Sequence, residues 1–229
     1  MSHYKYKAIL LDFYGTLVEE DSPFIYRIVD QIAEASGRDP SDIAREWSAI
    51  YRRMCFERRG AAFTTQRVIE VEGLQEMLGA CQVDLDAGAM VAGVFEYWQS
   101  PTPYPDTAPF LAHLPIPYCL VSNIDTADVQ SALCSLGWQF EQLVTSELCR
   151  AYKPHPEPFR AALELLNLQP HEVLHVGDSA TADVAGAQAL GIDVAWLNRS
   201  NRPMPAPRPT FVAQSLTDVL GYVNAHGAP

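Results

Sequence analysis

Short apolar runs alternate with segments of helical periodicity over much of the chain. The first apolar run spans residues 7–11 and ends at Asp12. Similar runs recur at Tyr118–Ser122, Leu143–Thr145, Val173–Gly177 and Asp193–Leu197. Between them lie helix-like segments at Thr126–Leu136, Pro156–Leu166 and 180–190. Alternation of this kind predicts an α/β fold with a doubly wound parallel sheet.

The pattern changes between residues 18 and 100, where strand-like runs disappear. Apolar positions at helical spacing are Phe24, Ile25, Ile28, Val29 and Ile32. Helical periodicity continues over 41–57, 64–78 and 86–99, with breaks at Gly37, Gly60 and Gly79. We therefore expect a four-helix cap domain at 18–100, inserted into a core domain formed by 1–17 and 101–229. Prolines at the exit of the insert stiffen the crossing between the two domains.

Composition narrows the possible partners. The chain carries a formal charge of −12 and is 48% hydrophobic. Such a charge repels nucleic acid and anionic membranes, so we expect neither as a partner. An anionic small molecule would need a local cation or a metal to draw it in. The five cysteines form no C-x-x-C pair, and no signal peptide or membrane span is evident, which favours a cytoplasmic protein. We expect a monomer or homodimer, between which the sequence does not decide.

Two predicted strands end in side chains suited to chemistry. Asp12 ends the first strand, and Gly15 lets the chain turn tightly behind it. A carboxylate in that position can attack an electrophile directly. Ser122 and Asn123 end the second strand, where the hydroxyl and nearby backbone N–H groups could hold a phosphate oxygen near the helix that starts at Thr126. We therefore take Ser122 and Asn123 as candidate substrate-binding residues.

The later part of the chain adds one cation and two further carboxylates. Lys153 can steady Asp12 and the charge that develops during reaction. Asp178 follows the strand that ends at Gly177, and Asp183 lies five residues further on. Three carboxylates brought together need a cation. Magnesium, which prefers oxygen ligands, is the natural choice.

These four segments, in this order, resemble the four sequence motifs of the haloacid dehalogenase (HAD) superfamily. The helical insert resembles the C1-type cap that follows the first motif in that superfamily. The resemblance covers essentially the whole chain and implies a HAD-like Rossmannoid core with Asp12 as a covalent nucleophile. It also implies a magnesium site formed by Asp12, the Tyr14 carbonyl and Asp178, with Asp183 as a ligand or directly behind the ligands. Thr16 would join Ser122 and Lys153 in binding the substrate's phosphoryl oxygens.

Tyr14 divides the family. In the phosphatases that the chain resembles, an aspartate two residues after the nucleophile protonates the leaving alcohol and then activates water. Tyrosine, with a reference pKa of about 10, is a poor base at neutral pH, and loss of acid–base assistance costs about 10²–10⁴ in rate. The 2-haloacid dehalogenases resemble this chain in having tyrosine there. Tyr14 is thus a candidate catalytic residue, beside Asp12 and Lys153, whose identity favours a leaving group that needs no proton.

Asp178 points the other way. In the metal-free dehalogenases the positions matching Asp178 and Ala180 are, by resemblance, a serine and an asparagine. An additional carboxylate repels an anionic haloacid and favours magnesium. The dehalogenases also place an arginine directly after a cap tryptophan, whereas Trp47 is followed here by Ser48.

The sequence therefore favours a magnesium-dependent phosphatase that acts on a small phosphorylated metabolite. A metal-free 2-haloacid dehalogenase ranks second. A weakly active binding or regulatory protein of the same fold is the third possibility.

Overall fold

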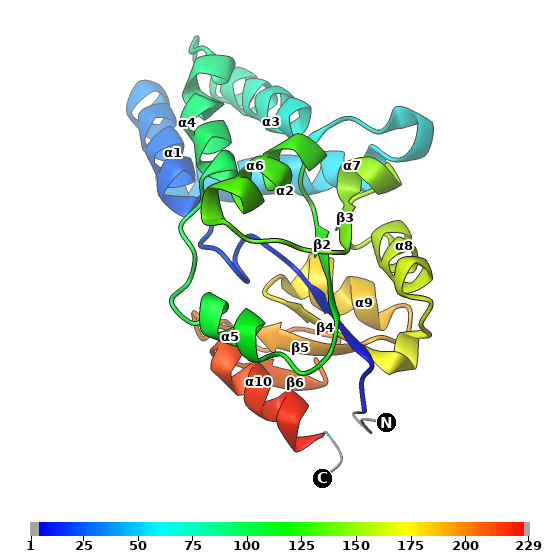
Figure 1. The fold of residues 1–229 in the computed structure, drawn as a ribbon. Helices are drawn as coiled ribbons and strands as arrows, with labels where there is room; N and C mark the ends of the chain where they lie inside the picture. The colour runs from blue at the N-terminus through cyan, green and yellow to red at the C-terminus, as the bar shows by residue number, and fades with distance from the viewer. Residues whose placement is uncertain (1–4, 227–229) are drawn as a thin grey trace. The chain divides into compact units, whose positions relative to one another are not determined.

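A parallel six-stranded sheet forms the centre of the first compact unit in the computed structural model, which describes residues 5–226 (Figure 1). Its strands are β1 (Ala8–Leu11), β2 (Tyr118–Ser122), β3 (Leu143–Thr145), β4 (Val173–Gly177), β5 (Asp193–Leu197) and β6 (Phe211–Ala213). Their order across the sheet is β3-β2-β1-β4-β5-β6. The α/β fold and the first five strands are confirmed. The short edge strand β6 was not predicted, because the proline-rich connector before it masks the apolar pattern.

Both faces of the sheet are buried. Leu10, Val121 and Trp196 lie on one face and pack in one cluster with Phe159 and Val184 from the helical segments that cover it. The neighbouring strand residues point to the opposite face and are also buried: Ile9, Leu11, Leu120, Leu174, Val176, Ala195 and Leu197. A sheet covered on both faces needs apolar side chains at most strand positions. This explains why its strands read as continuous apolar runs.

The helical segments of this unit connect the strands and cover the sheet. They are α5 (Thr107–His113), α7 (Ser146–Cys149), α8 (Pro156–Leu166), η2 (Pro170–Glu172), η3 (Ala180–Ala185), α9 (Gly186–Gln188) and α10 (Leu216–Ala225). The helix predicted at 180–190 is not regular, since η3 is a π-helix. The backbone N–H groups of Asp183 and Val184 both donate to the Ser179 carbonyl, at 3.0 and 3.1 Å. Wide turns of this kind occur often at functional sites.

The second compact unit comprises residues 20–101 together with 124–138. Its helices are α1 (Ser22–Ser36), α2 (Pro40–Glu57), η1 (Gly60–Ala62), α3 (Gln66–Cys81), α4 (Ala87–Gln99) and α6 (Thr126–Leu136). The predicted helical cap is confirmed, but a helix break at Gly79 is wrong. Helix α3 continues to Cys81, since one glycine costs a helix only about 1 kcal/mol and the preceding Leu78 is anchored by burial. The domain boundaries 1–17, 18–100 and 101–229 stay predictions.

Charged side chains join α6 to the start of α3 inside this unit. The Asp125 carboxylate accepts hydrogen bonds from the backbone N–H groups of Gln66 and Arg67, at 2.7 and 3.1 Å. It thereby caps α3 from a distant part of the chain, where helix dipoles favour negative charge. The Arg67 guanidinium in turn binds both carboxylate oxygens of Asp128 on α6, at 2.7 and 2.5 Å.

The helices of residues 5–226 include none with the length and apolar character needed to cross a membrane.

Glu70 lies inside the second unit and is 7% exposed. Burial raises its pKa to about 8, and the nearby charge of Asp21 adds to the rise. An unfolded glutamate titrates near about pH 4.3. Between these two values the folded protein holds a proton that the unfolded chain releases. The resulting contribution to stability is therefore complete below the unfolded pKa and is lost as pH rises through the folded pKa.

We expect the melting temperature of the wild-type protein to fall as pH rises from about 5 to about 9, in part through Glu70. Glu70→Gln removes the ionisable group while keeping its shape, so its melting temperature should exceed that of the wild type at the high end and match it at the low end. Glu34→Gln, at an exposed position on α1, is the control for the change in net charge. Thermal scans that give the same pH dependence for Glu70→Gln and the wild type would contradict this assignment.

Candidate active site

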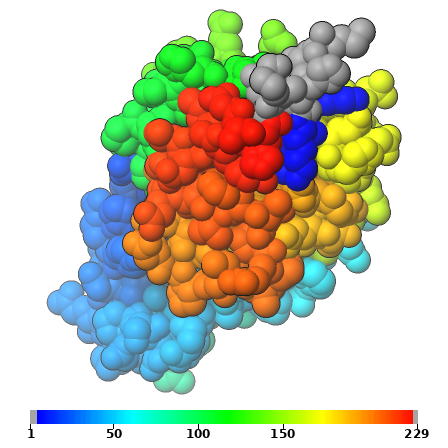
Figure 2. All heavy atoms as spheres, turned by 90° about the horizontal axis from the view of Figure 1, so that it is seen from below, coloured from blue at the N-terminus to red at the C-terminus, as the bar shows by residue number. Residues whose placement is uncertain are grey.

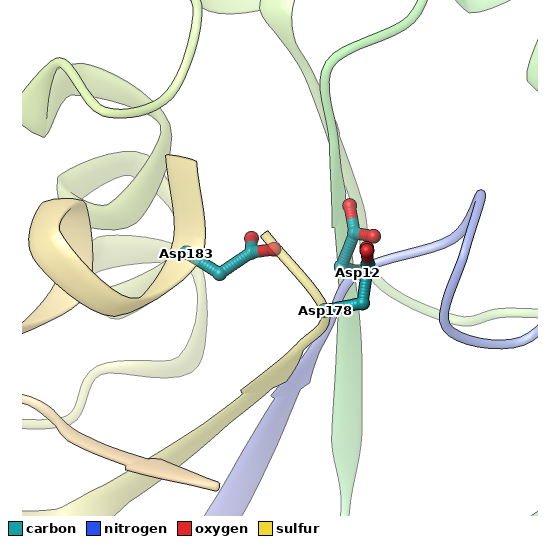
Figure 3. Close-up of side chains that lie close together, drawn as sticks. All are labelled: Asp12, Asp178 and Asp183. Carbon is teal, nitrogen blue, oxygen red and sulfur yellow. The ribbon is translucent and has the colours of Figure 1, made fainter. Parts of the chain in front are cut away.

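The predicted site residues meet at the carboxyl ends of the two central strands, where the strand order reverses. Asp12 follows β1 and Asp178 follows β4, and these strands are neighbours in the sheet. Figure 3 shows the two side chains close together at their strand ends, with Asp183 extending from η3. One carboxylate oxygen from each residue lies within 4.8 Å of the others. Ligands of open α/β sheets bind at such a reversal, outside the carboxyl ends of the strands.

Two glycines make this close approach possible. A β-carbon at Gly15, whose φ is +83°, would stand 2.6 Å from an Asp178 carboxylate oxygen. A β-carbon at Gly177 would stand 2.3 Å from the Asp183 carboxylate carbon. Both positions therefore require glycine, because the carboxylates occupy the space that a side chain would need.

Lys153 is the central cation of the site. Its side chain is 1% exposed, and Nζ donates to Asp12 Oδ1 at 2.7 Å, to Asp183 Oδ1 at 2.7 Å and to the Val121 carbonyl at 2.8 Å. Burial alone would lower the pKa of Lys153, but the two carboxylates outweigh it and raise the pKa. The lysine is consequently charged at every physiological pH. It uses its three N–H donors on groups from three different segments of the chain.

Asp183 is held on all sides. Its Oδ1 contacts His175 Nε2 at 2.9 Å as well as Lys153, and its Oδ2 accepts the Ser179 backbone N–H at 2.9 Å. Burial by itself would raise the pKa of Asp183, but Lys153 and His175 outweigh it and hold that pKa well below its usual range. Asp183 stays ionised and fixes the position of Lys153.

Asp12 is the most exposed partner of Lys153, although only 7% of it is accessible. Burial raises the pKa of Asp12, and the Lys153 ammonium acts in the opposite direction. Thr16 Oγ1 donates to Asp12 Oδ2 at 3.2 Å, so each carboxylate oxygen has a donor. These two donors orient the carboxylate and stabilise its ionised form, which is the form that attacks as a nucleophile.

Asp178 has a partner that sequence reasoning missed. Arg202 Nη2 lies 3.0 Å from Asp178 Oδ2 and 2.7 Å from its backbone carbonyl, which also accepts the Trp196 indole N–H at 2.7 Å. No local signal marks Arg202, which follows Asn201 in a connector rich in proline. His175 does carry a signal, as a polar residue in an apolar strand, but that signal does not indicate its partner Asp183.

The other predicted residues also lie near the carboxyl ends of these strands. Ser122 is buried at the end of β2. The Asn123 amide donates to the Lys153 carbonyl at 2.9 Å and accepts the Lys153 backbone N–H at 2.7 Å, so it positions the lysine. Tyr14 is half-buried and packs edge-on against Phe13. The substrate-binding roles of Thr16, Ser122 and Asn123, and the ligand role of the Tyr14 carbonyl, stay predictions.

The charges of the cluster fit a divalent cation. Asp12, Asp178 and Asp183 carry three negative charges, and Lys153 and Arg202 supply two positive ones. The net charge of the cluster is then −1, which would repel an anionic substrate. One Mg²⁺ on the oxygen donors would change this net charge to +1. Asp12 and Asp178 offer the more accessible oxygens. Asp183 is already surrounded by donors and is better placed to hold Lys153.

Known proteins resemble this chain over most of its length. The family model described as haloacid dehalogenase-like hydrolase matches residues 6–191. The chain belongs to this family. It is 27% identical over 201 residues to (S)-2-haloacid dehalogenase of Xanthobacter autotrophicus, covering 84% of this chain and 75% of the relative.

Two further comparisons concern the fold and the other branch of the family. The solved structure of L-2-haloacid dehalogenase from Xanthobacter autotrophicus superposes with a TM-score of 0.74 at 24% identity, covering 96% of this chain and 98% of that chain. Pyrophosphatase PpaX of Bacillus mycoides (strain KBAB4) is 35% identical, but over only 98 residues, which are 42% of this chain and 45% of the relative. The HAD-like fold and the hydrolase family are thus confirmed. The preference for a phosphatase over a dehalogenase is not supported by these relatives, because the longer match is to a dehalogenase.

Asp12→Asn should abolish turnover of any substrate while leaving the fold intact. We expect the rate to fall by on the order of 10³-fold or more, because an amide is a far poorer nucleophile than a carboxylate. Steady-state rates and circular dichroism check the two halves of this expectation. Asp30→Asn, at an exposed position on α1, is the matched control and should retain full activity. Undiminished turnover by a folded Asp12→Asn protein would rule out the covalent mechanism.

Proposed function

We propose that this protein is a magnesium-dependent phosphatase that acts on a small phosphorylated metabolite through a covalent intermediate on Asp12. The observation that carries the proposal is the cluster of Asp12, Asp178 and Asp183 carboxylate oxygens within 4.8 Å of one another beside a buried lysine. A site built only to hold a nucleophile and its lysine needs no third carboxylate at the position of Asp178.

The reaction would proceed in two displacements. Asp12 Oδ attacks phosphorus, the bond to the leaving oxygen breaks, and an aspartyl phosphate forms. Water then attacks the aspartyl phosphate and releases inorganic phosphate and the free carboxylate. Lys153 would neutralise charge on the phosphoryl oxygens from its position beside Asp12, and Ser122 and Thr16 would orient these oxygens. Bound to Asp12 and Asp178, magnesium would supply further positive charge to the same oxygens.

Tyr14 limits which phosphate compounds the site can use. It stands where a phosphatase carboxylate would protonate the leaving alcohol, and a phenol is a poor general base for the second step at neutral pH. We therefore favour substrates whose leaving group departs as a stable anion, such as acyl phosphates or phosphoric anhydrides. The name of the PpaX relative, a pyrophosphatase, is consistent with an anhydride.

A metal-free 2-haloacid dehalogenase is the second candidate. It is favoured by Tyr14 and by the similarity over 84% of the chain to a protein named (S)-2-haloacid dehalogenase. In that reaction Asp12 would displace halide from carbon 2, and water would hydrolyse the ester. Arg202 also weakens the electrostatic objection to this candidate, because it offsets the charge of Asp178.

A substrate panel with and without magnesium separates the two candidates. Acyl phosphates, pyrophosphate, alkyl and aryl phosphate esters and 2-haloacids should each be tested in millimolar magnesium and in chelator. We expect phosphate release that chelation abolishes, and no halide release. Halide release in chelator, with no phosphate release in either condition, would reverse this ranking.

Tyr14→Asp should raise the hydrolysis of alkyl phosphate esters, because it places a proton donor beside the nucleophile. The gain should approach the lower part of the about 10²–10⁴-fold range for acid–base catalysis, and acyl phosphates should gain least. Rates with alkyl, aryl and acyl phosphates measure this dependence on the leaving group. Tyr14→Phe, which lacks the hydroxyl and adds no acid, is the control. An equal response of all three substrate classes would contradict the role assigned to Tyr14.

A further inference from the structure

Arg202 reaches the site from a surface segment. The connector between β5 and β6 contains the exposed residues 200–204 and belongs to the orange surface in Figure 2. Within it, the Asn198 side chain accepts the Arg202 backbone N–H at 2.8 Å and donates to the Arg202 carbonyl at 2.9 Å. Asn198 is 7% exposed. This buried amide fixes the backbone of Arg202. The guanidinium therefore extends toward Asp178 from a backbone position that is held in place.

The guanidinium contacts Asp178 twice. Arg202 Nη2 binds one carboxylate oxygen at 3.0 Å and the backbone carbonyl at 2.7 Å. The Trp196 indole N–H donates to the same carbonyl at 2.7 Å. If the guanidinium moved away, the Asp178 backbone would keep the tryptophan as a partner. Its departure would also remove one donor and one positive charge from the Asp178 carboxylate.

The two cations of the site differ in their freedom to leave. The Lys153 side chain is 1% exposed and is held by two carboxylates, so moving it would leave buried charges without compensation. The Arg202 side chain is 43% exposed. Its guanidinium is already partly hydrated, so breaking the ion pair leaves the charge in water. An exposed ion pair contributes only a small free energy. Arg202 is therefore the exchangeable cation of the pair.

We propose that Arg202 is the resident counter-ion of Asp178 and that it competes with a divalent cation for this carboxylate. The inference rests on the magnesium site of the proposed function and deepens it. With Arg202 in place the cluster carries −1 and Asp178 is held in a fixed orientation without metal. Loss of the guanidinium leaves −2, which attracts a divalent cation more strongly. Arg202 thus sets the magnesium affinity of the site, and it acts through Asp178 as a positioning residue.

The test is calorimetric titration with MgCl₂ of the full-length protein at low ionic strength. Arg202→Gln should lower the dissociation constant about two- to ten-fold, the range for an ion pair strengthened by a second hydrogen bond. Arg202→Lys keeps the charge but lacks the planar fork, and should fall between Arg202→Gln and the wild type. Arg208→Gln, at an exposed position of the same connector, removes the same charge and should bind as the wild type does. Equal affinities of Arg202→Gln and the wild type, or an equal shift in Arg208→Gln, would overturn the proposal.

A double-mutant comparison shows whether the effect passes through Asp178. In the background of Asp178→Asn, the change Arg202→Gln should alter magnesium affinity much less than it does beside Asp178, and an undiminished effect would overturn the proposal. Phosphate release measured on the same samples distinguishes the two ideas. Tighter binding by Arg202→Gln without phosphatase activity in any sample supports the counter-ion role and removes the proposed function. Absence of binding in every variant, Arg202→Gln included, overturns both.

Discussion

The organisation of the site depends on one buried ammonium group. Lys153 Nζ lies between Asp12 and Asp183, and only 1% of the lysine side chain is exposed to solvent. Removing one partner of a buried ion pair costs about 3–5 kcal/mol, because the remaining charge stays buried. The lysine therefore restricts where β1, the end of β2 and the π-helix after β4 can place their polar groups. The parallel sheet brings these segments together, and the lysine fixes the final positions of their side chains.

The charge balance at Asp178 affects the two candidate reactions in opposite ways. A dehalogenase site must accept an anionic haloacid without metal, and a phosphatase site must hold a cation that neutralises a phosphoryl group. Asp178 disfavours the first reaction when its charge is uncompensated. Arg202 supplies compensation from the side chain of a surface connector. In the scheme proposed above, one exchangeable arginine would shift the site between a metal-free and a metal-bound state, while Asp12 and Lys153 stay in place.

The chain leaves the site and enters the second compact unit within one peptide bond. Asn123, which clamps the backbone of Lys153, belongs to the first unit, and Ile124 belongs to the second. Two residues later α6 begins, and Asp125 caps α3 through its carboxylate. Polar groups next to the site are therefore used for two purposes. Asn123 positions the backbone of Lys153 in the first unit, and Asp125 caps helix α3 in the second unit.

The sequence by itself determined the parallel α/β fold, five of the six strands described and the helical character of the cap. Continuous apolar runs ending in Asp12, Ser122 and Asp178 identify strand ends, since most side chains buried on the two faces of a sheet are apolar. Local sequence also indicated Asp12 and Lys153 as residues of the candidate site. It could not indicate Arg202 or the contact of His175 with Asp183, because each forms only when segments distant in sequence fold together. The tertiary structure alone decided the charge balance of the site, which depends on distances and burial rather than on the order of residues.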